Sequence, residues 1–381
     1  MIYLDHNATT PPAPAVVQAM VHTMRGTWAN PSSQHGPGQD AKRALGAARS
    51  TVANRLGCKP LEVIFTSGAT ESNQMAVRGL LAAAAPTRQR VLFSSVEHSA
   101  HLRLARALAA IGVQVDYLPV LPNGKLDLVA AAGLMGPDVA LVSLMAANNE
   151  TGVLMPTQEV AHLAHAAGAL FHMDATQWIG KLAFDFASCG ADAVSLSAHK
   201  FHGPKGVGAL LLRQGTAFVP QTPGSQERAR RGGTENLPAI AGMAAALELL
   251  GNVADEAQRL SALRDALEAG LQHALPQTHV WCQNVDRLPG TSYLRFGQLS
   301  VDVVLQRLER LSVAASSGAA CSSTGTDPSH VLAAMGVAEM DALAAVRLSL
   351  GSTTTVTDVN TVLKQLPPLL APVLVQELTT I

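Results

Sequence analysis

Two residues at the ends of apolar runs suggest the chemistry of this chain. The run 193–196 ends shortly before Lys200, and the run 169–173 ends at Asp174. A lysine amine can form a Schiff base with a carbonyl compound, and a carboxylate can keep a pyridine nitrogen protonated so that the ring accepts electrons. A lysine and an acid at the tips of two buried strands are what a pyridoxal phosphate enzyme needs. The pair therefore predicts this cofactor and a reaction that starts at the α-carbon of an amino acid.

A second feature is a candidate phosphate cradle. The segment 65–73 follows a strand-like run and opens a helix-like one, with Gly68 at the turn. Glycine lets the backbone turn tightly, and a helix N-terminus offers unpaired N–H groups to an anion. A Ser-Gly pair before a helix is also a common cap, so this motif alone is weak. The candidate phosphate-binding residues, including two beside Lys200, are Ala69, Thr70, Ser197 and His199.

Four further polar residues could face the same site. His98 follows a strand and could stack on the cofactor ring and act as an acid or base, or simply serve as a structural hydrogen-bonding residue. Asn149 could bind the substrate or the ring hydroxyl, or be a turn asparagine. Gln177, three residues past Asp174, can donate to the ring oxygen. Arg347 lies in an apolar segment and needs an anion, which could be a substrate carboxylate or an internal acid.

Cys321 differs from the other cysteines. It lies in the run 315–326, which is small and polar, with two glycines and no bulky anchor. We expect such a segment to be mobile and exposed, so its thiol is not a core filler. Cys321 could be a nucleophile that moves between a reaction centre and a partner, or an incidental surface thiol. No Cys-x-x-Cys pair is present, and we expect no disulfides.

The order of elements predicts an α/β fold. Helix-like and strand-like segments alternate from about residue 15 to 250, and the apolar runs are continuous, as in strands covered on both faces. This pattern predicts a mostly parallel seven-stranded sheet flanked by helices, with ligands at the carboxyl ends of the strands. The expected strands are 63–65, 91–94, 114–117, 139–144, 169–173, 193–196 and 208–212. The expected helices are 13–24, 39–56, 71–84, 100–111 and 158–167.

We expect two domains. The large cofactor-binding domain spans residues 14–254, and a smaller α/β domain combines residues 1–13 with 255–381 and carries the cysteine loop at about 315–327. The alanine- and leucine-rich stretch 239–271 is one long helix or two and links the domains. Further helices are expected at 302–311, 329–335 and 359–366.

Bulk composition narrows the function classes. The net charge of -1 argues against a nucleic-acid partner held by electrostatics. The N-terminus lacks the features of a signal peptide, and no apolar stretch approaches the ~18 residues of a membrane helix, so we expect a cytoplasmic protein without membrane contact. The histidine pairs 98/101 and 162/165 have no third ligand of matching pattern, so no metal site is predicted, although Cys321 could transiently ligate an iron–sulfur cluster.

Taken together, these motifs resemble the cysteine desulfurases of the class V aminotransferase group. The resemblance implies the fold of type I pyridoxal phosphate-dependent transferases and a homodimer. The long loop around Cys321 resembles the branch that feeds iron–sulfur cluster assembly, including the nitrogen-fixation type. The matching segments are 3–10, 30–35, 66–71, 97–98, 148–152, 174–177, 197–200, 231–236, 328–332 and 347–351.

The resemblance also implies roles for individual residues. Lys200 would carry the cofactor covalently, Asp174 would pair with the pyridine nitrogen and His98 would stack on the ring. Thr234 would reach the cofactor phosphate of the other subunit, which implies shared active sites. The remaining implied roles are the ring oxygen for Gln177, the phosphate for Thr70, Ser197 and His199, and the substrate for Asn149 and Arg347.

The implied reaction is removal of sulfur from L-cysteine. It would give L-alanine and a persulfide on Cys321, with Lys200 and His98 as the other catalytic residues. The persulfide sulfur would pass to an acceptor protein such as an iron–sulfur cluster scaffold. Two alternatives stay open at this point: a selenocysteine lyase or another aminotransferase or lyase on the same scaffold, and an inactive sulfur-relay scaffold.

Overall fold

A seven-stranded sheet forms the centre of the computed structural model, which describes residues 1–318 and 328–378. Its strand order is β2-β8-β7-β6-β5-β3-β4. β8 runs antiparallel to both of its neighbours, and the other neighbouring strands are parallel, so the predicted mostly parallel seven-stranded sheet is confirmed. The strands are β2 (Val63–Thr66), β3 (Arg90–Ser94), β4 (Gln114–Leu118), β5 (Val139–Met145), β6 (Leu170–Asp174), β7 (Ala193–Ser197) and β8 (Gly208–Leu212).

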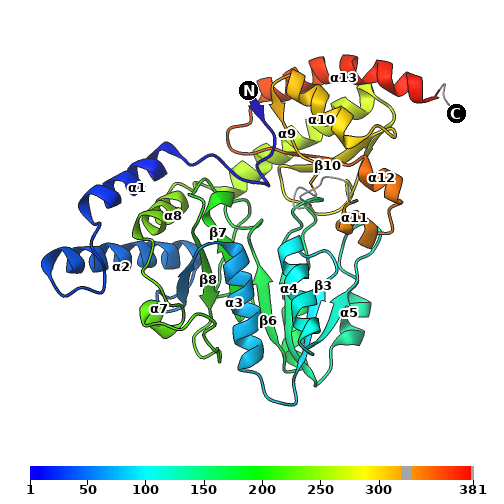
Figure 1. Cartoon of the computed structure of the whole chain (residues 1–381). Coiled ribbons are helices and arrows are strands. Elements are labelled where there is room, and N and C mark those ends of the chain that lie inside the picture. The colour runs from blue at the N-terminus through cyan, green and yellow to red at the C-terminus, as the bar shows by residue number, and fades with distance from the viewer. Residues whose placement is uncertain (319–327, 379–381) are drawn as a thin grey trace.

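Both faces of this sheet are covered, which explains the continuous apolar runs. Successive side chains of a strand point to opposite faces, and Ile64 and Phe65 accordingly belong to two different buried clusters. Every residue of β5 is buried. Figure 1 shows the helices around the sheet. They are α1 (Pro14–Gly26), α2 (Gly36–Leu56), α3 (Ala69–Ala82), α4 (Ser99–Ala110), α5 (Leu128–Leu134), α6 (Thr157–Ala166), α7 (Gln226–Ala229) and α8 (Leu237–Glu248).

A second layer of structure lies at the top of Figure 1, where both chain termini are found. Its apolar cluster is separate from the two around the large sheet and includes Leu267, Phe296, Leu348 and Val362. The strands here are β9 (Thr278–Val280), β10 (Thr291–Phe296) and β12 (Val346–Ser349), in an antiparallel sheet, and the parallel pair β1 (Ile2–Tyr3) and β11 (Val313–Ala314). The helices are α9 (Val253–Ala274), α10 (Val301–Arg310), α11 (His330–Ala334), α12 (Glu339–Leu343) and α13 (Val356–Leu378).

The stretch expected to be one long helix or two forms two. α8 and α9 meet at an angle of 79°, and the side chain of Asn252 caps α9 by accepting a hydrogen bond from the backbone N–H of Ala254. Among the described residues no single helix is long and apolar enough to span a membrane; only α8 and α9, taken together as a bent pair, meet that test of length and composition. The boundary between residues 254 and 255 stays a prediction.

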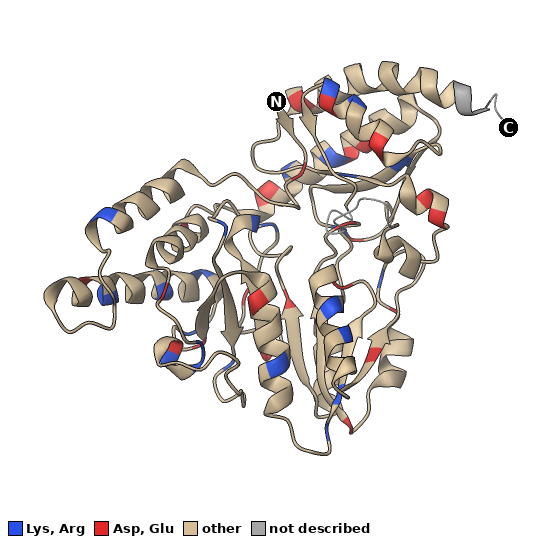
Figure 2. Cartoon of the chain, in the orientation of Figure 1, with Lys and Arg blue, Asp and Glu red and all other residues tan. Residues whose placement is uncertain are grey.

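Charge is distributed over the whole chain. Figure 2 shows the positions of basic and acidic residues interspersed along the ribbon in both layers. Several of these charges are paired, such as Arg90 with Asp116 and Asp138 and Arg287 with the buried Glu268. Paired charges present little net field to a polyanion, in keeping with the net charge of -1.

Candidate active site

A cavity of about 640 Å³ opens at the carboxyl ends of β6 and β7. It brings together ten residues that the sequence singled out: Ala69, Thr70, His98, Asn149, Asp174, Gln177, Ser197, His199, Lys200 and Arg347. Two others are not placed there. Thr234 is exposed and is not part of the cavity lining, and Cys321 lies outside the described residues.

Lys200 ends a short 3-10 turn, Ala198–Lys200, that directly follows β7. Its Nζ donates to the backbone oxygens of Asn7, at 2.6 Å, and Ala8, at 2.8 Å. The N-terminal segment therefore lies directly against the lysine that the sequence proposed as the point of cofactor attachment.

Asp174 is the last residue of β6 and is 6% exposed. Its Oδ1 accepts a hydrogen bond from the backbone N–H of Thr176 at 2.9 Å, and its Oδ2 accepts one from Nδ2 of Asn73 at 2.7 Å. Burial alone would raise the pKa of Asp174, but these hydrogen bonds and the nearby His101 hold the pKa below its ordinary value. The carboxylate therefore stays ionised near pH 7, as a partner for a protonated ring nitrogen must.

The start of α3, which also lines this cavity, suits an anion. Gly68 has φ +154° and directly precedes α3, whose first N–H groups lack helical partners. Ser197 is 3% exposed, and its Oγ would lie 3.6 Å from a Cβ at position 68. Burial, aided by Lys200, lowers the pKa of His199 to about 4, so that its ring is neutral at pH 7. An amine, a buried carboxylate and an anion cradle on one cavity fit pyridoxal phosphate.

Gln177 is held by two residues that the sequence reading did not single out. Its Nε2 donates to the backbone oxygen of Asn7 at 2.9 Å, and its Oε1 accepts from Nζ of Lys181 at 2.5 Å. Lys181 also donates to Oδ1 of Asn7 at 2.7 Å. Burial, followed by the charges of Lys200 and Arg347, lowers the pKa of Lys181 well below its ordinary value. Together these contacts fix which end of the Gln177 amide is the donor.

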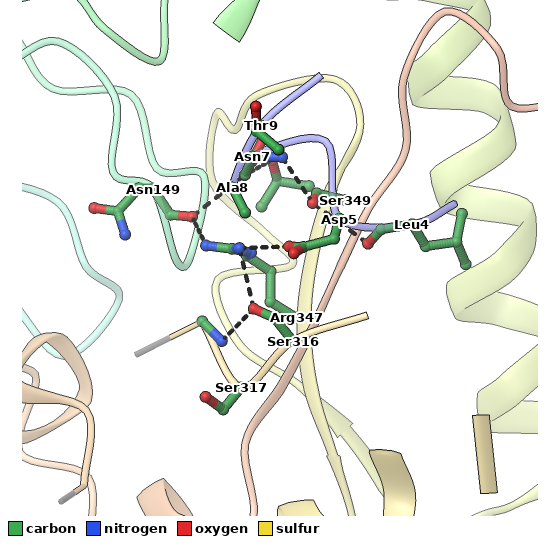
Figure 3. A network of polar contacts seen from close by, with 12 residues as sticks. Leu4, Asp5, Asn7, Ala8, Thr9, Asn149, Ser316, Ser317, Arg347 and Ser349 are labelled. Carbon is green, nitrogen blue, oxygen red and sulfur yellow. Dashed lines mark hydrogen bonds and ion pairs between the residues drawn. The ribbon is translucent and has the colours of Figure 1, made fainter. Parts of the chain in front are cut away.

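Arg347 lies on β12 and reaches the cavity from the second layer (Figure 3). Its Nη2 donates to Oδ1 of Asp5 at 2.7 Å and to Oγ of Ser316 at 3.1 Å, and its Nη1 donates to the backbone oxygen of Asn149 at 2.9 Å. The internal ion pair that the sequence left open is therefore present. Arg347 also lines the cavity, so the second reading, a substrate carboxylate, is not excluded by this pair.

A buried polar network lies beneath Asp174. Nδ1 of His101 is 3.2 Å from Oε2 of Glu97, and Oγ of Ser143 is 3.3 Å from Nε2 of His101 and 2.8 Å from Nδ1 of His172. Three potential metal-ligand atoms, one from the side chain of each of Glu97, His101 and Asp174, lie within 4.8 Å of one another. Burial raises the pKa of Glu97 and lowers that of His172 to about 3. His98, the residue after Glu97, lines the cavity and caps the N-terminus of α4.

A larger cavity, of about 860 Å³, shares Asn7 and Lys200 with the first. Its lining includes neither Asp174 nor the first turn of α3. The smaller cavity is the candidate active site because, of these two cavities among the described residues, it is the one that combines the amine, the carboxylate and the anion cradle.

The residues that sequence reasoning missed are partners of those it found. Asn73 was quoted within the cradle motif without a role, and its spacing of four residues from Ala69 on α3 was a signal that both face one side. Asp5 and Asn7 lay in a motif used only for the family resemblance. Lys181 carried no signal, because its role depends on contact with a segment 174 positions away.

Comparison with known proteins agrees with this geometry. Residues 2–362 match the family model described as aminotransferase class-V. A cysteine desulfurase of Cereibacter sphaeroides is 46% identical over 371 residues, which cover 97% of this chain and 95% of the relative. Cysteine desulfurase NifS of Azotobacter vinelandii is 43% identical over 373 residues, covering 97% and 92%. A solved structure named NifS-like protein superposes with a TM-score of 0.91 at 34% identity, covering 97% of this chain and 99% of that one.

Proposed function

This chain belongs to the class V aminotransferase family and is a cysteine desulfurase that uses pyridoxal phosphate, and from that premise we propose how its residues divide the reaction. The observation that carries the proposal is the cavity on which Lys200, Asp174 and the cradle at Gly68 meet. The related desulfurases favour neither a selenocysteine lyase nor an inactive scaffold, because their names assign them the cysteine reaction.

Each side chain has a part that its position supports. Bound pyridoxal phosphate supplies an electron-accepting ring beside the α-carbon of the substrate. Lys200 would hold the cofactor, and its amine would take the α-proton of the substrate. Asp174, ionised and buried, keeps the ring nitrogen protonated. Arg347 binds the substrate carboxylate. Gln177 would bind the ring oxygen of the cofactor, and Asn149 would bind the substrate. The cofactor phosphate would be held by Ala69, Thr70, Ser197 and His199.

Cys321 performs the sulfur transfer in this proposal. Its thiolate attacks the sulfur of the bound cysteine, so that an S–S bond forms while the Cβ–S bond breaks. A persulfide stays on Cys321, and the carbon skeleton leaves as L-alanine once protons return to it. A free thiol titrates near ~8.5, and His98, at the cavity edge, is the candidate proton acceptor.

Replacing Cys321 by serine tests this assignment. We expect Cys321→Ser to lose persulfide formation and alanine production while the cofactor absorbance stays that of the native protein, because the residues proposed to hold the cofactor do not include Cys321. A Lys200→Ala variant is the second arm: after borohydride reduction, no cofactor mass should remain on the peptide containing residue 200. Sulfur transfer that survives in Cys321→Ser would refute the role of Cys321.

The sulfur acceptor is proposed to be a protein such as an iron–sulfur cluster scaffold, and the place of action the cytoplasm. The support is the resemblance of the loop around Cys321 to the branch that feeds cluster assembly, together with a relative named NifS. Persulfide sulfur on an accessible thiol can pass to another thiol by exchange, so the acceptor needs a reactive cysteine.

We propose that two chains form the enzyme. Thr234 is exposed and is not among the residues that line the cavity of its own chain. α1 also exposes a row of apolar side chains at helical spacing, Val17, Val21 and Met24, with Trp28 just beyond its end at 75% exposure. Exposed apolar rows of this kind are typical of surfaces that a second chain covers.

A further inference from the structure

Asp5 belongs to the N-terminal motif for which the proposed function gives no role. Backbone hydrogen bonds hold its segment against β12: the N–H of Ser349 donates to Leu4 at 2.7 Å, and the N–H of His6 donates to the oxygen of Ser349 at 3.1 Å. Arg347 and Ser349 lie on the same strand, β12. The parallel bridge between Asp5 and Ser349 therefore places the Asp5 carboxylate beside Arg347 (Figure 3).

The guanidinium of Arg347 has only two edges that can clasp a carboxylate with two hydrogen bonds. One edge uses Nε and Nη2, and the other uses Nη1 and Nη2. Nη2 is common to both, and here it donates to Asp5 and to Ser316. Nε has no hydrogen-bond partner among the described residues. Both N–H groups of Nη2 are therefore in use, so a substrate carboxylate that clasps either edge must share or displace the hydrogen bond to Asp5 or the one to Ser316.

Burial explains why such an internal carboxylate is needed. The side chain of Arg347 is 3% exposed, and that of Asp5 is 19% exposed. A guanidinium buried without an anion carries a large desolvation cost, so Arg347 needs a partner whenever no substrate is bound. Asp5 does not line the cavity and so makes no contact with substrate itself.

We propose that Asp5 is an affinity-lowering residue, an internal carboxylate that competes with the carboxylate of the amino acid for Arg347 and weakens the binding of substrate and product alike. Substrate and product carry the same carboxylate, so an uncontested arginine would hold L-alanine as firmly as L-cysteine. Binding energy that is the same in the ground state and in the transition state gives no advantage in kcat. Competition from Asp5 lets the product leave. This inference rests on the proposed role of Arg347.

The test is equilibrium binding of the product to the cofactor-bound enzyme, followed by the change in visible absorbance. Asp5→Asn keeps an oxygen acceptor for Nη2 but removes the charge. We expect it to bind L-alanine about three- to tenfold more tightly, because a charged competitor is replaced by a neutral one. Ethylamine, which is alanine without its carboxylate, should bind the variant and the native enzyme equally. In turnover, KM for L-cysteine should fall, and product inhibition by L-alanine should rise.

Two controls separate the possible failures. Asp265→Asn removes the same charge from the surface pair with Arg264 and should leave alanine binding unchanged. Arg347→Gln should weaken alanine binding; if it does not, the proposed role of Arg347 fails, and the inference with it. If Arg347→Gln weakens binding but Asp5→Asn binds alanine no more tightly than the native enzyme, Asp5 is merely a support for Arg347, and the inference alone is overturned.

Discussion

At the scale of single residues, Lys181 is the buried amine that the reaction does not use. It lines the larger cavity together with Lys200 but not the candidate active site, and its amine donates to Gln177 and Asn7. Burial, followed by the charges of Lys200 and Arg347, lowers its pKa well below the ordinary value. We propose that Lys181 orients the Gln177 amide, so that the Nε2 end is the one available to the cofactor ring oxygen.

Changing Lys181 to methionine tests that role. Methionine keeps the apolar stem but leaves Oε1 of Gln177 and Oδ1 of Asn7 without their donor. We expect the free energy of unfolding to fall by about 1–3 kcal/mol, the cost of unsatisfied buried acceptors, and the cofactor to dissociate faster. Urea unfolding and the decay of cofactor absorbance measure the two effects. Lys42→Met, on the exposed face of α2, is the control; equal dissociation rates in both variants would contradict the orienting role.

The residues predicted from sequence and those missed differ in one physical respect. Lys200, Asp174 and Gln177 lie at or just after the ends of buried strands, and parallel strands bring their carboxyl ends to one edge of a sheet. Their convergence therefore follows from the order of elements. Asp5 contacts Arg347, and Lys181 contacts Asn7 in addition to the nearby Gln177. The contacts of Asp5 with Arg347 and of Lys181 with Asn7 each join residues more than 170 positions apart, which no local pattern encodes.

At the scale of elements, the strands of the central sheet were predictable because both of its faces are buried and each strand is therefore a continuous apolar run. The strands of the smaller domain were not located, because β10 (TSYLRF) and β12 (VRLS) contain polar residues that interrupt the apolar run. The break between α8 and α9 was left open because alanine and leucine continue across it; only the cap at Asn252 marks the new helix. The proposed phosphate cradle depends on the start of α3.

Gly68 should be irreplaceable at that start. Its φ of +154° is strained for any residue with a Cβ, and the backbone N–H groups after it form the anion cradle. We expect Gly68→Ala to bind pyridoxal phosphate at least tenfold more weakly, because the strained residue shifts the first turn of α3. Fluorescence titration of the cofactor-free chain measures this affinity. Gly46→Ala is the matched control, since Gly46 lies inside α2 with open space around its Cβ position. This variant should bind the cofactor normally, and its free energy of unfolding should be slightly higher than that of the native protein. Normal binding by Gly68→Ala would remove the cradle from the proposal.

At the scale of the whole molecule, the described residues form two apolar clusters around the large sheet and a third in the second layer, and the site takes residues from both layers. The proposed large domain, 14–254, contributes Lys200 and Asp174, whereas the proposed small domain contributes Asp5 and Arg347. The N-terminal segment contacts both, because Asn7 binds Gln177 on one side and Ser349 on the other. Local sequence patterns predict the two groups of elements. They do not predict that the N-terminal segment contacts both groups, because those contacts join residues far apart in the sequence.

The proposed shared site gives the last prediction. If Thr234 holds the cofactor phosphate of the partner chain, a Lys200→Ala chain and a Thr234→Val chain should complement each other. In their hybrid dimer, one site combines an intact Lys200 with an intact Thr234 from the other chain. We expect the hybrid, purified through two different tags, to regain about half of the activity of the native dimer, since one of its two sites is complete. If each chain instead used its own Thr234, neither site would be complete, and the hybrid would show only the residual activity of the Thr234→Val site. Cofactor content per hybrid, measured by absorbance, gives the same distinction without turnover.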